Sequence, residues 1–338
     1  MSEQQKQTVH IGTRRSALAL RQVDLVIAAL QPHHPNVHFQ VHALATLGDK
    51  NQTASLPSLG KGLWTNELEA KLFNNEVDFI VHCLKDVPTT LPEGGKIGVV
   101  TEREDPRDVV VMKKKWAEQG KYKVLADLPE GAIVGTSSVR RAAQLRRQYP
   151  GLVFKDVRGN IETRMRKCDE EDYDCIILAA AGLLRMGYDE RIAQWLDSTT
   201  EGGGMLHAVG QGALAMEIRE GDEKTLEIIK PLCHEKTMVA TFAERAVMRS
   251  LEGGCSVPIG VETKWVEDDK LQLKATVVSL DGKESVDGQS VEVVKTTEEA
   301  EEMGRKLAED LAKRGAQKIL DVVNKGRASG GALKVGDL

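Results

Sequence analysis

Short apolar strands alternate with helical segments through the first two thirds of the chain, and this alternation limits the fold more than any other feature of the sequence. Repeated strand–helix units form parallel sheets that helices cover on both faces, so an α/β fold class is expected here. Strands are expected at 8–12, 36–45, 77–84, 109–112, 132–135, 153–155 and 175–178. Helices are expected at 17–30, 64–74, 139–148, 161–167 and 180–185.

The chain has 338 residues, more than one hydrophobic core usually supports, so several domains are expected. An apolar run at 214–218 can return the chain to the first sheet. Beyond it, a helix at 236–251, alternating strands within 260–294 and a helix at 298–324 indicate a smaller α+β unit. We expect domain 1 to comprise residues 1–108 and 209–232, domain 2 residues 109–208, and domain 3 residues 233–338.

Composition excludes several classes of partner. A net charge of -5 and an aromatic content of 4% argue against nucleic acid, which needs a basic face and stacking rings. No apolar run is long enough to span a bilayer, so no membrane partner is expected. Five irregularly spaced cysteines are typical of a reducing compartment, and we predict a cytoplasmic protein. The histidine spacing matches no zinc motif, and no metal is expected.

The expected strand at 77–84 stops abruptly at Lys85 and Asp86, and Pro88 prevents its easy continuation. Ligands of open α/β sheets lie beyond the carboxyl ends of the strands, where this pair falls. A carboxylate held there beside a cation is well placed to act on a charged substrate. The alternative is an ordinary ion pair in a solvated loop, since short charge pairs are common at strand ends.

Three arginine-bearing segments each follow a strand and open a helix. Arg14 precedes the first helix, Arg140 and Arg141 begin the second, and Arg158 and Arg164 lie at the start of the third. Helix N-termini favour anions, and a guanidinium grips a carboxylate through two parallel hydrogen bonds. Because like charges on one cleft repel each other, their convergence indicates a small anionic ligand. Solvated helix caps are the alternative for each segment.

Cys255 lies between two glycines and Pro258, on a segment that has the freedom to turn. A thiolate is the nucleophile among ordinary side chains at neutral pH. The other four cysteines are interpreted as packing residues, because they lie in or beside apolar strands or after helical stretches. For Cys255 the pattern alone leaves a reactive thiol and a buried structural thiol equally open.

Taken together, these segments resemble the porphobilinogen deaminase family. The matching motifs occur in the family's order: TRRS at 13–16, GKGLWTNELE at 60–69, VHCLKDVP at 81–88, GTSSVRR at 135–141, VRGN at 157–160, AAGLLRMG at 180–187, AVGQGAL at 208–214 and LEGGCSVP at 251–258. The resemblance implies two periplasmic-binding-protein-like domains with parallel-rich sheets, a cleft between them, and a smaller α+β domain. It also implies a monomeric transferase of heme biosynthesis that joins four porphobilinogen molecules head to tail with loss of ammonia, releasing hydroxymethylbilane.

The resemblance further implies a dipyrromethane cofactor, made from two substrate units and joined through a thioether to Cys255. Asp86 is then the catalytic aspartate, and Lys85 beside it is the second catalytic residue. The cofactor-binding residues implied are Arg140, Arg141, Arg158, Arg164, Arg185, Ser138 and Thr136, and the substrate-binding residues are Arg14, Ser16, Trp64 and Gln22. Residues 48–62 match the family's mobile active-site loop. Many relatives have phenylalanine at the position of Trp64 and serine at that of Cys83, and the extra thiol is expected to increase sensitivity to alkylation.

Two other readings of the sequence stay open at this point. A non-catalytic two-lobe protein that binds a small anionic ligand explains the arginines but has no need of Lys85, Asp86 or Cys255. An enzyme that forms a Schiff base through Lys85 lacks an evident phosphate loop for pyridoxal phosphate.

Overall fold

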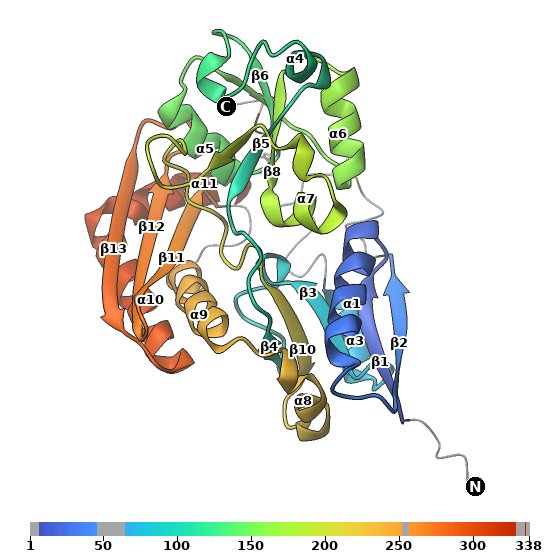
Figure 1. Cartoon of the computed structure of the whole chain (residues 1–338). Coiled ribbons are helices and arrows are strands. Elements are labelled where there is room, and N and C mark those ends of the chain that lie inside the picture. Colours follow the sequence, from blue (N-terminus) through green and yellow to red (C-terminus); the bar gives the residue numbers. More distant parts are fainter. Residues whose placement is uncertain (1–6, 46–64, 252–256, 329–334, 336–338) are drawn as a thin grey trace, which may run out of the picture.

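A computed structural model describes residues 7–45, 65–251, 257–328 and 335. Figure 1 shows two α/β units, one above the other, with an antiparallel sheet and its helices packed along their side. Within the described ranges, no helix is long and apolar enough to cross a membrane.

The first sheet has the strand order β2-β1-β3-β10-β4. Its strands are β1 (Gln7–Arg14), β2 (Val37–Leu44), β3 (Phe79–Cys83), β4 (Gly95–Val100) and β10 (Leu214–Arg219). The helices of this unit are α1 (Ala17–Leu30), α3 (Asn66–Phe73) and α8 (Glu223–Ile229). Apolar side chains of α1 pack on one face of the sheet and those of α3 on the other, so alternate strand residues are buried on both sides.

The second sheet has the order β7-β6-β8-β5-β9. Its strands are β5 (Asp108–Met112), β6 (Ile133–Gly135), β7 (Val153–Lys155), β8 (Cys175–Ala179) and β9 (Gln194–Leu196). The helices are α4 (Lys114–Glu118), α5 (Val139–Gln148), α6 (Ile161–Glu170) and α7 (Ala180–Met186). Helix α5 covers one face of the sheet, whereas α6 and α7 cover the other.

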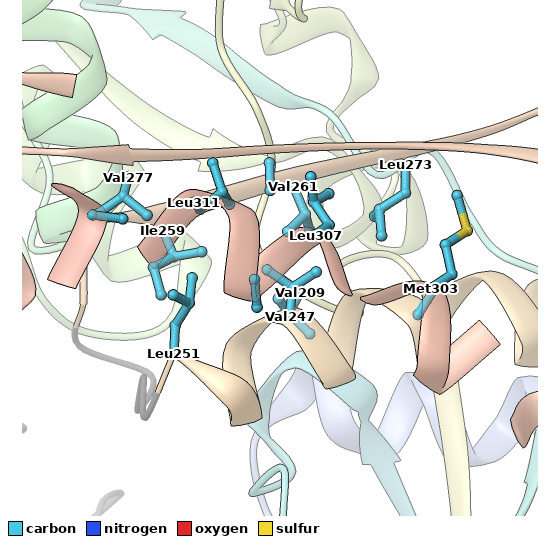
Figure 2. Packing of buried hydrophobic residues seen from close by; sticks show 14 of the residues in the cluster. Val209, Val247, Leu251, Ile259, Val261, Leu273, Val277, Met303, Leu307 and Leu311 are labelled. Carbon is cyan, nitrogen blue, oxygen red and sulfur yellow. The ribbon is translucent and has the colours of Figure 1, made fainter. Parts of the chain in front are cut away.

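The third unit is an antiparallel sheet covered by helices. Its strands are β11 (Ile259–Glu267), β12 (Lys270–Val278) and β13 (Ser285–Val293), and its helices are α9 (Glu235–Ser250), α10 (Thr297–Leu311) and α11 (Gln317–Ala328). Figure 2 shows the core, in which Ile259 and Val261 of the sheet lie near Val247 of α9 and Leu307 of α10. The helix expected at 298–324 is interrupted by a π-helical turn, where Gly315 has φ of 108°.

Two crossing segments run side by side between the two α/β units. The chain leaves the first sheet after β4 and returns to it at β10, and the Thr101 and Glu104 N–H groups donate to the carbonyls of Leu214 (3.0 Å) and Gly212 (3.2 Å). A Cβ on Gly212 would lie 2.3 Å from the Glu104 carbonyl oxygen, and φ there is +90°. Only glycine fits such an approach, which accounts for part of the motif at 208–214.

The expected α/β class is confirmed, with one difference in strand direction. In each five-stranded sheet four strands run the same way, but β10 and β5 are antiparallel to their neighbours. Both of these strands adjoin a crossing, and the sequence pattern does not indicate the direction in which a strand runs. Strand β4 was not expected because two glycines and a lysine interrupt its apolar pattern. The domain boundaries remain a prediction, although 108, 208 and 232 fall at the edges of these groups of strands.

Candidate active site

A cavity of about 340 Å³ lies between the two α/β units, at the carboxyl ends of their strands. The first unit contributes the end of β1, the start of α1 and the turn after β3. The second contributes the end of β8 and the beginnings of α6 and α7. This is where an α/β sheet places its ligands. Six cationic side chains line the cavity, namely Arg14, Lys85, Arg141, Arg158, Arg164 and Arg185.

Asp86 ends a single 3₁₀ turn, Leu84–Asp86, that stops strand β3 at the cavity wall. Its carboxylate lies 3.9 Å from Arg14 Nη1, and the Asp86 side chain is 32% exposed. Burial lowers the pKa of Lys85, against the opposing effect of Asp86. Lys85 forms no ion pair with the described residues, so Arg14, not the expected Lys85, is the cation that pairs with Asp86. The carboxylate therefore faces the cavity with a guanidinium from the neighbouring strand.

Arg140 and Arg141 share one buried carboxylate. Asp108 accepts from Arg140 Nη1 at 2.7 Å and from Arg141 Nη2 at 2.8 Å, and it is fully buried. Burial alone raises the pKa of Asp108, but the two guanidinium charges outweigh it and hold the pKa well below its usual range. One negative charge thus faces two positive charges. Arg141 lines the cavity, so part of this excess positive charge lies at the cavity wall.

Arg140 is not among the described residues that line the cavity, and its expected role in binding the cofactor stays a prediction. Its guanidinium also donates to the Leu206 carbonyl at 2.7 Å. Thr136 and Ser138 likewise lie outside the described lining, and Ser138 is the N-cap of α5. Ser138 Oγ accepts from the Arg141 N–H, and Thr136 Oγ1 accepts from the Ser138 N–H.

The remaining cations come from the second unit. Arg164 donates through Nε to the Gly159 carbonyl at 2.7 Å, and burial, reinforced by the charge of Arg141, lowers its pKa to about 10. Arg185 donates to the Gly212 carbonyl at 2.6 Å, so it contacts the returning crossing segment. Arg158 also lines the cavity. Arginine charges held this closely in a partly dehydrated space repel one another, and an anionic ligand relieves that repulsion.

Ser16, Gln22 and Cys83 form the cavity wall on the side of the first unit. Ser16 caps α1 by accepting from the Ala19 N–H. The buried Gln22 amide donates to Cys83 Sγ at 3.0 Å. Burial, with a further contribution from Asp86, raises the pKa of the Cys83 thiol. Because the thiolate is the reactive form, this shift opposes the increased sensitivity to alkylation expected from the sequence.

Several predicted residues cannot be placed in the site. Cys255, Trp64 and the loop at 48–62 lie outside the described residues. Conversely, sequence reasoning did not identify Ser137, Glu162 or Asp108. Ser137 lies within the recognised segment at 135–141, so its position was a usable signal. Asp108 gave no local signal, because its partners lie 32 and 33 residues away along the chain.

The residues present fit an acid-rich group such as dipyrromethane. Four arginines of the second unit line the cavity, and guanidinium is the side chain best suited to paired contacts with carboxylates. Asp86 supplies a negative charge in the same space. The fold and the cavity therefore define an α/β protein with a cationic cavity between two domains, suited in charge to a polycarboxylate ligand.

Comparison with known proteins identifies the family. A model described as "Porphobilinogen deaminase, dipyromethane cofactor binding domain" matches residues 9–227, and one for the family's C-terminal domain matches residues 238–313. A porphobilinogen deaminase of Neurospora crassa is 95% identical over 338 residues, 100% of both chains. Proteins with the same name from Yarrowia lipolytica and Saccharomyces cerevisiae are 51% and 49% identical, over 94% of this chain and 93% and 98% of theirs. The chain belongs to the porphobilinogen deaminase family.

Membership of this enzyme family decides against a non-catalytic binding protein.

Solved structures with similar folds include the probable amino-acid ABC transporter extracellular-binding protein YtmK of Bacillus subtilis and the BenM effector binding domain with its effector benzoate. They are 12% and 15% identical to this chain, with TM-scores of 0.40 and 0.39. They match 66% and 67% of this chain and 89% and 91% of their own.

Proposed function

We propose that this enzyme joins four porphobilinogen molecules head to tail, with loss of ammonia, on a dipyrromethane primer attached through a thioether to Cys255. The observation that supports this proposal most is the convergence of six cationic side chains around Asp86 in one cavity. The primer supplies a tethered pyrrole end to which each new unit is joined. All other roles below belong to side chains of the chain itself.

The arginines serve as partners for the acetate and propionate groups. Every porphobilinogen unit carries two carboxylates, so a growing chain needs many cations in a fixed arrangement. Arg141, Arg158, Arg164 and Arg185 lie on the second unit and are assigned to the primer. We assign Arg14, Ser16, Gln22 and Lys85, on the opposite wall, to the incoming substrate. Trp64 is retained as an aromatic partner of the substrate on the basis of the family motif alone.

Asp86 acts on the positive charge that develops when ammonia leaves the substrate. The carboxylate lies at the cavity surface, 3.9 Å from Arg14 Nη1. An ionised carboxylate stabilises a nearby cation and accepts a hydrogen bond from a pyrrole N–H. It is also close enough to the ligand space to assist proton transfers. Arg140, Ser138 and Thr136 are assigned indirect roles, because they hold Asp108 and the start of α5.

We further propose a monomer that works in the cytoplasm without nucleic-acid or membrane partners. The net charge of -5 supports the exclusion of nucleic acid. The four cysteines within the described ranges are free thiols, which supports a reducing compartment.

The test of the proposed function is the stoichiometry of turnover. Purified protein is incubated with porphobilinogen, and ammonia and tetrapyrrole are both quantified. The proposal predicts four ammonia molecules for each linear tetrapyrrole released. Binding of porphobilinogen without release of ammonia would refute it.

A further inference from the structure

Helix α9 links the two parts of the proposed reaction site. The helix ends at Ser250, five residues before Cys255, and its apolar side packs into the core of the third unit. Its other side contacts the first unit, where Met238 and Phe242 pack against Leu84 and Val87 around the turn that carries Asp86. In Figure 1, α9 lies beside β4 of the first sheet.

Arg245 lies on this same side of α9, one turn after Phe242. Its side chain is buried, at 4% exposure. Nη2 donates to the Pro88 carbonyl at 2.6 Å, and Nη1 donates to the Val87 carbonyl at 3.2 Å. A charged donor makes stronger hydrogen bonds than a neutral one, and the guanidinium fork fixes direction as well as distance.

The two carbonyls belong to the residues that directly follow Asp86. Val87 donates its own N–H to Leu84, and Pro88 has no N–H, so the backbone here has little regular pairing to hold it. The contacts of Arg245 therefore restrain the backbone next to the Asp86 turn, and they do so from outside the described cavity lining. They do so from a helix whose carboxyl end leads directly to the segment containing Cys255.

We propose that Arg245 is a positioning residue that fixes the Asp86 turn relative to the helix leading to Cys255. This inference rests on the proposed function, because it concerns the placement of the Asp86 carboxylate that acts in the reaction. Arg245 itself lies outside the cavity lining among the described residues. Its loss moves the Asp86 carboxylate, and a displacement of about 1 Å can reduce a reaction rate by ~10²-fold.

Arg249 provides a matched control one turn further along α9. It contacts the Thr89 carbonyl at 3.5 Å and pairs with Glu301, but its side chain is 40% exposed. Arg245→Gln, Arg245→Lys and Arg249→Gln are compared with the wild-type enzyme. Each is checked for folding by circular dichroism, for primer attachment by intact mass, and for kcat and KM on porphobilinogen.

The proposal predicts that kcat of folded, primer-loaded Arg245→Gln falls by at least ~10-fold while KM changes less than ~3-fold. Arg245→Lys, which keeps a charged donor, recovers part of the loss, and Arg249→Gln behaves as wild type. A folded Arg245 variant that lacks the primer also supports the inference, because the primer is assembled from substrate molecules and its assembly depends on the same placement of Asp86. If Arg245→Gln does not fold, Arg245→Lys decides the matter. Wild-type kcat in a folded Arg245 variant overturns the inference, whereas an inactive wild-type enzyme overturns the proposed function instead.

Discussion

Replacing Asp108 with asparagine tests the shared carboxylate behind the cavity. Asp108→Asn keeps the shape of the side chain and removes its charge. Arg140 and Arg141 then remain buried with no carboxylate between them, and the new amide N–H₂ group is directed at a guanidinium that can only donate. The amide of Gln211, which donates to Asp108 at 3.0 Å, loses its charged acceptor as well.

The magnitude follows from the burial of all three charged groups. Their side chains are 0%, 6% and 8% exposed, so water replaces little of the lost interaction. Removing one partner of a buried ion pair costs about 3–5 kcal/mol. With an unfolding entropy of about 2.1 cal/mol/K per residue, this loss lowers the Tm of a 338-residue chain by about 4–7 °C. Because Arg141 lines the cavity and is assigned to the primer, the share of purified protein that carries the primer also falls.

Asp105→Asn is the matched control, because Asp105 also pairs with an arginine of the same crossing segment. The Asp105 and Arg107 side chains are 23% and 37% exposed, and such a pair contributes less than ~1 kcal/mol. Urea unfolding and calorimetry at pH 7 measure both variants against wild type. If Asp108→Asn is no less stable than Asp105→Asn, the assignment of a buried charge cluster is wrong.

Three further predictions follow from the ionisable groups. Asp86→Asn keeps the fold and lowers turnover by ~10² or more in steady-state assays, because the amide no longer stabilises a cation; near-normal turnover contradicts its role. Glu244 is buried, yet its pairing with Arg103 lowers its pKa from 4.5 to about 2, which corresponds to about 3 kcal/mol of stability. That stability is present above pH 4.5 and is lost as pH falls toward 2, so urea titrations of Glu244→Gln should vary less over this range than those of wild type. Iodoacetamide should label Cys83 more slowly than a free thiol at pH 7, because burial raises its pKa; fast labelling in peptide maps contradicts the burial of its sulfur.

Local signals in the sequence predict much of the fold. Helix α1 begins and ends where expected because Ser16 supplies an N-cap before a regular apolar pattern. Helix α5 likewise follows the cap at Ser138. The strand ends carrying Arg14 and Asp86 were also predictable, since charged residues interrupt apolar runs there. In each of these cases the determining interactions lie within a few residues along the chain.

The pairing of the charges could not be predicted in this way. Arg140 and Arg141 are adjacent in sequence, but consecutive helix residues point about 100° apart. Because both residues are arginines, the sequence does not indicate which of the two faces the cavity. Asp108 and Arg245 act on partners brought together by the crossing segments and by the third unit. The antiparallel direction of β5 and β10 has the same origin. These features depend on tertiary contacts with no local periodicity.

Peptide mapping of the purified protein by mass spectrometry tests most directly whether the primer is attached to Cys255. The account predicts that the peptide containing Cys255 carries the mass of two linked pyrrole units, and that Cys255→Ser removes both the added mass and the activity. An active enzyme whose Cys255 peptide is unmodified, or whose adduct maps to another cysteine, contradicts the central claim.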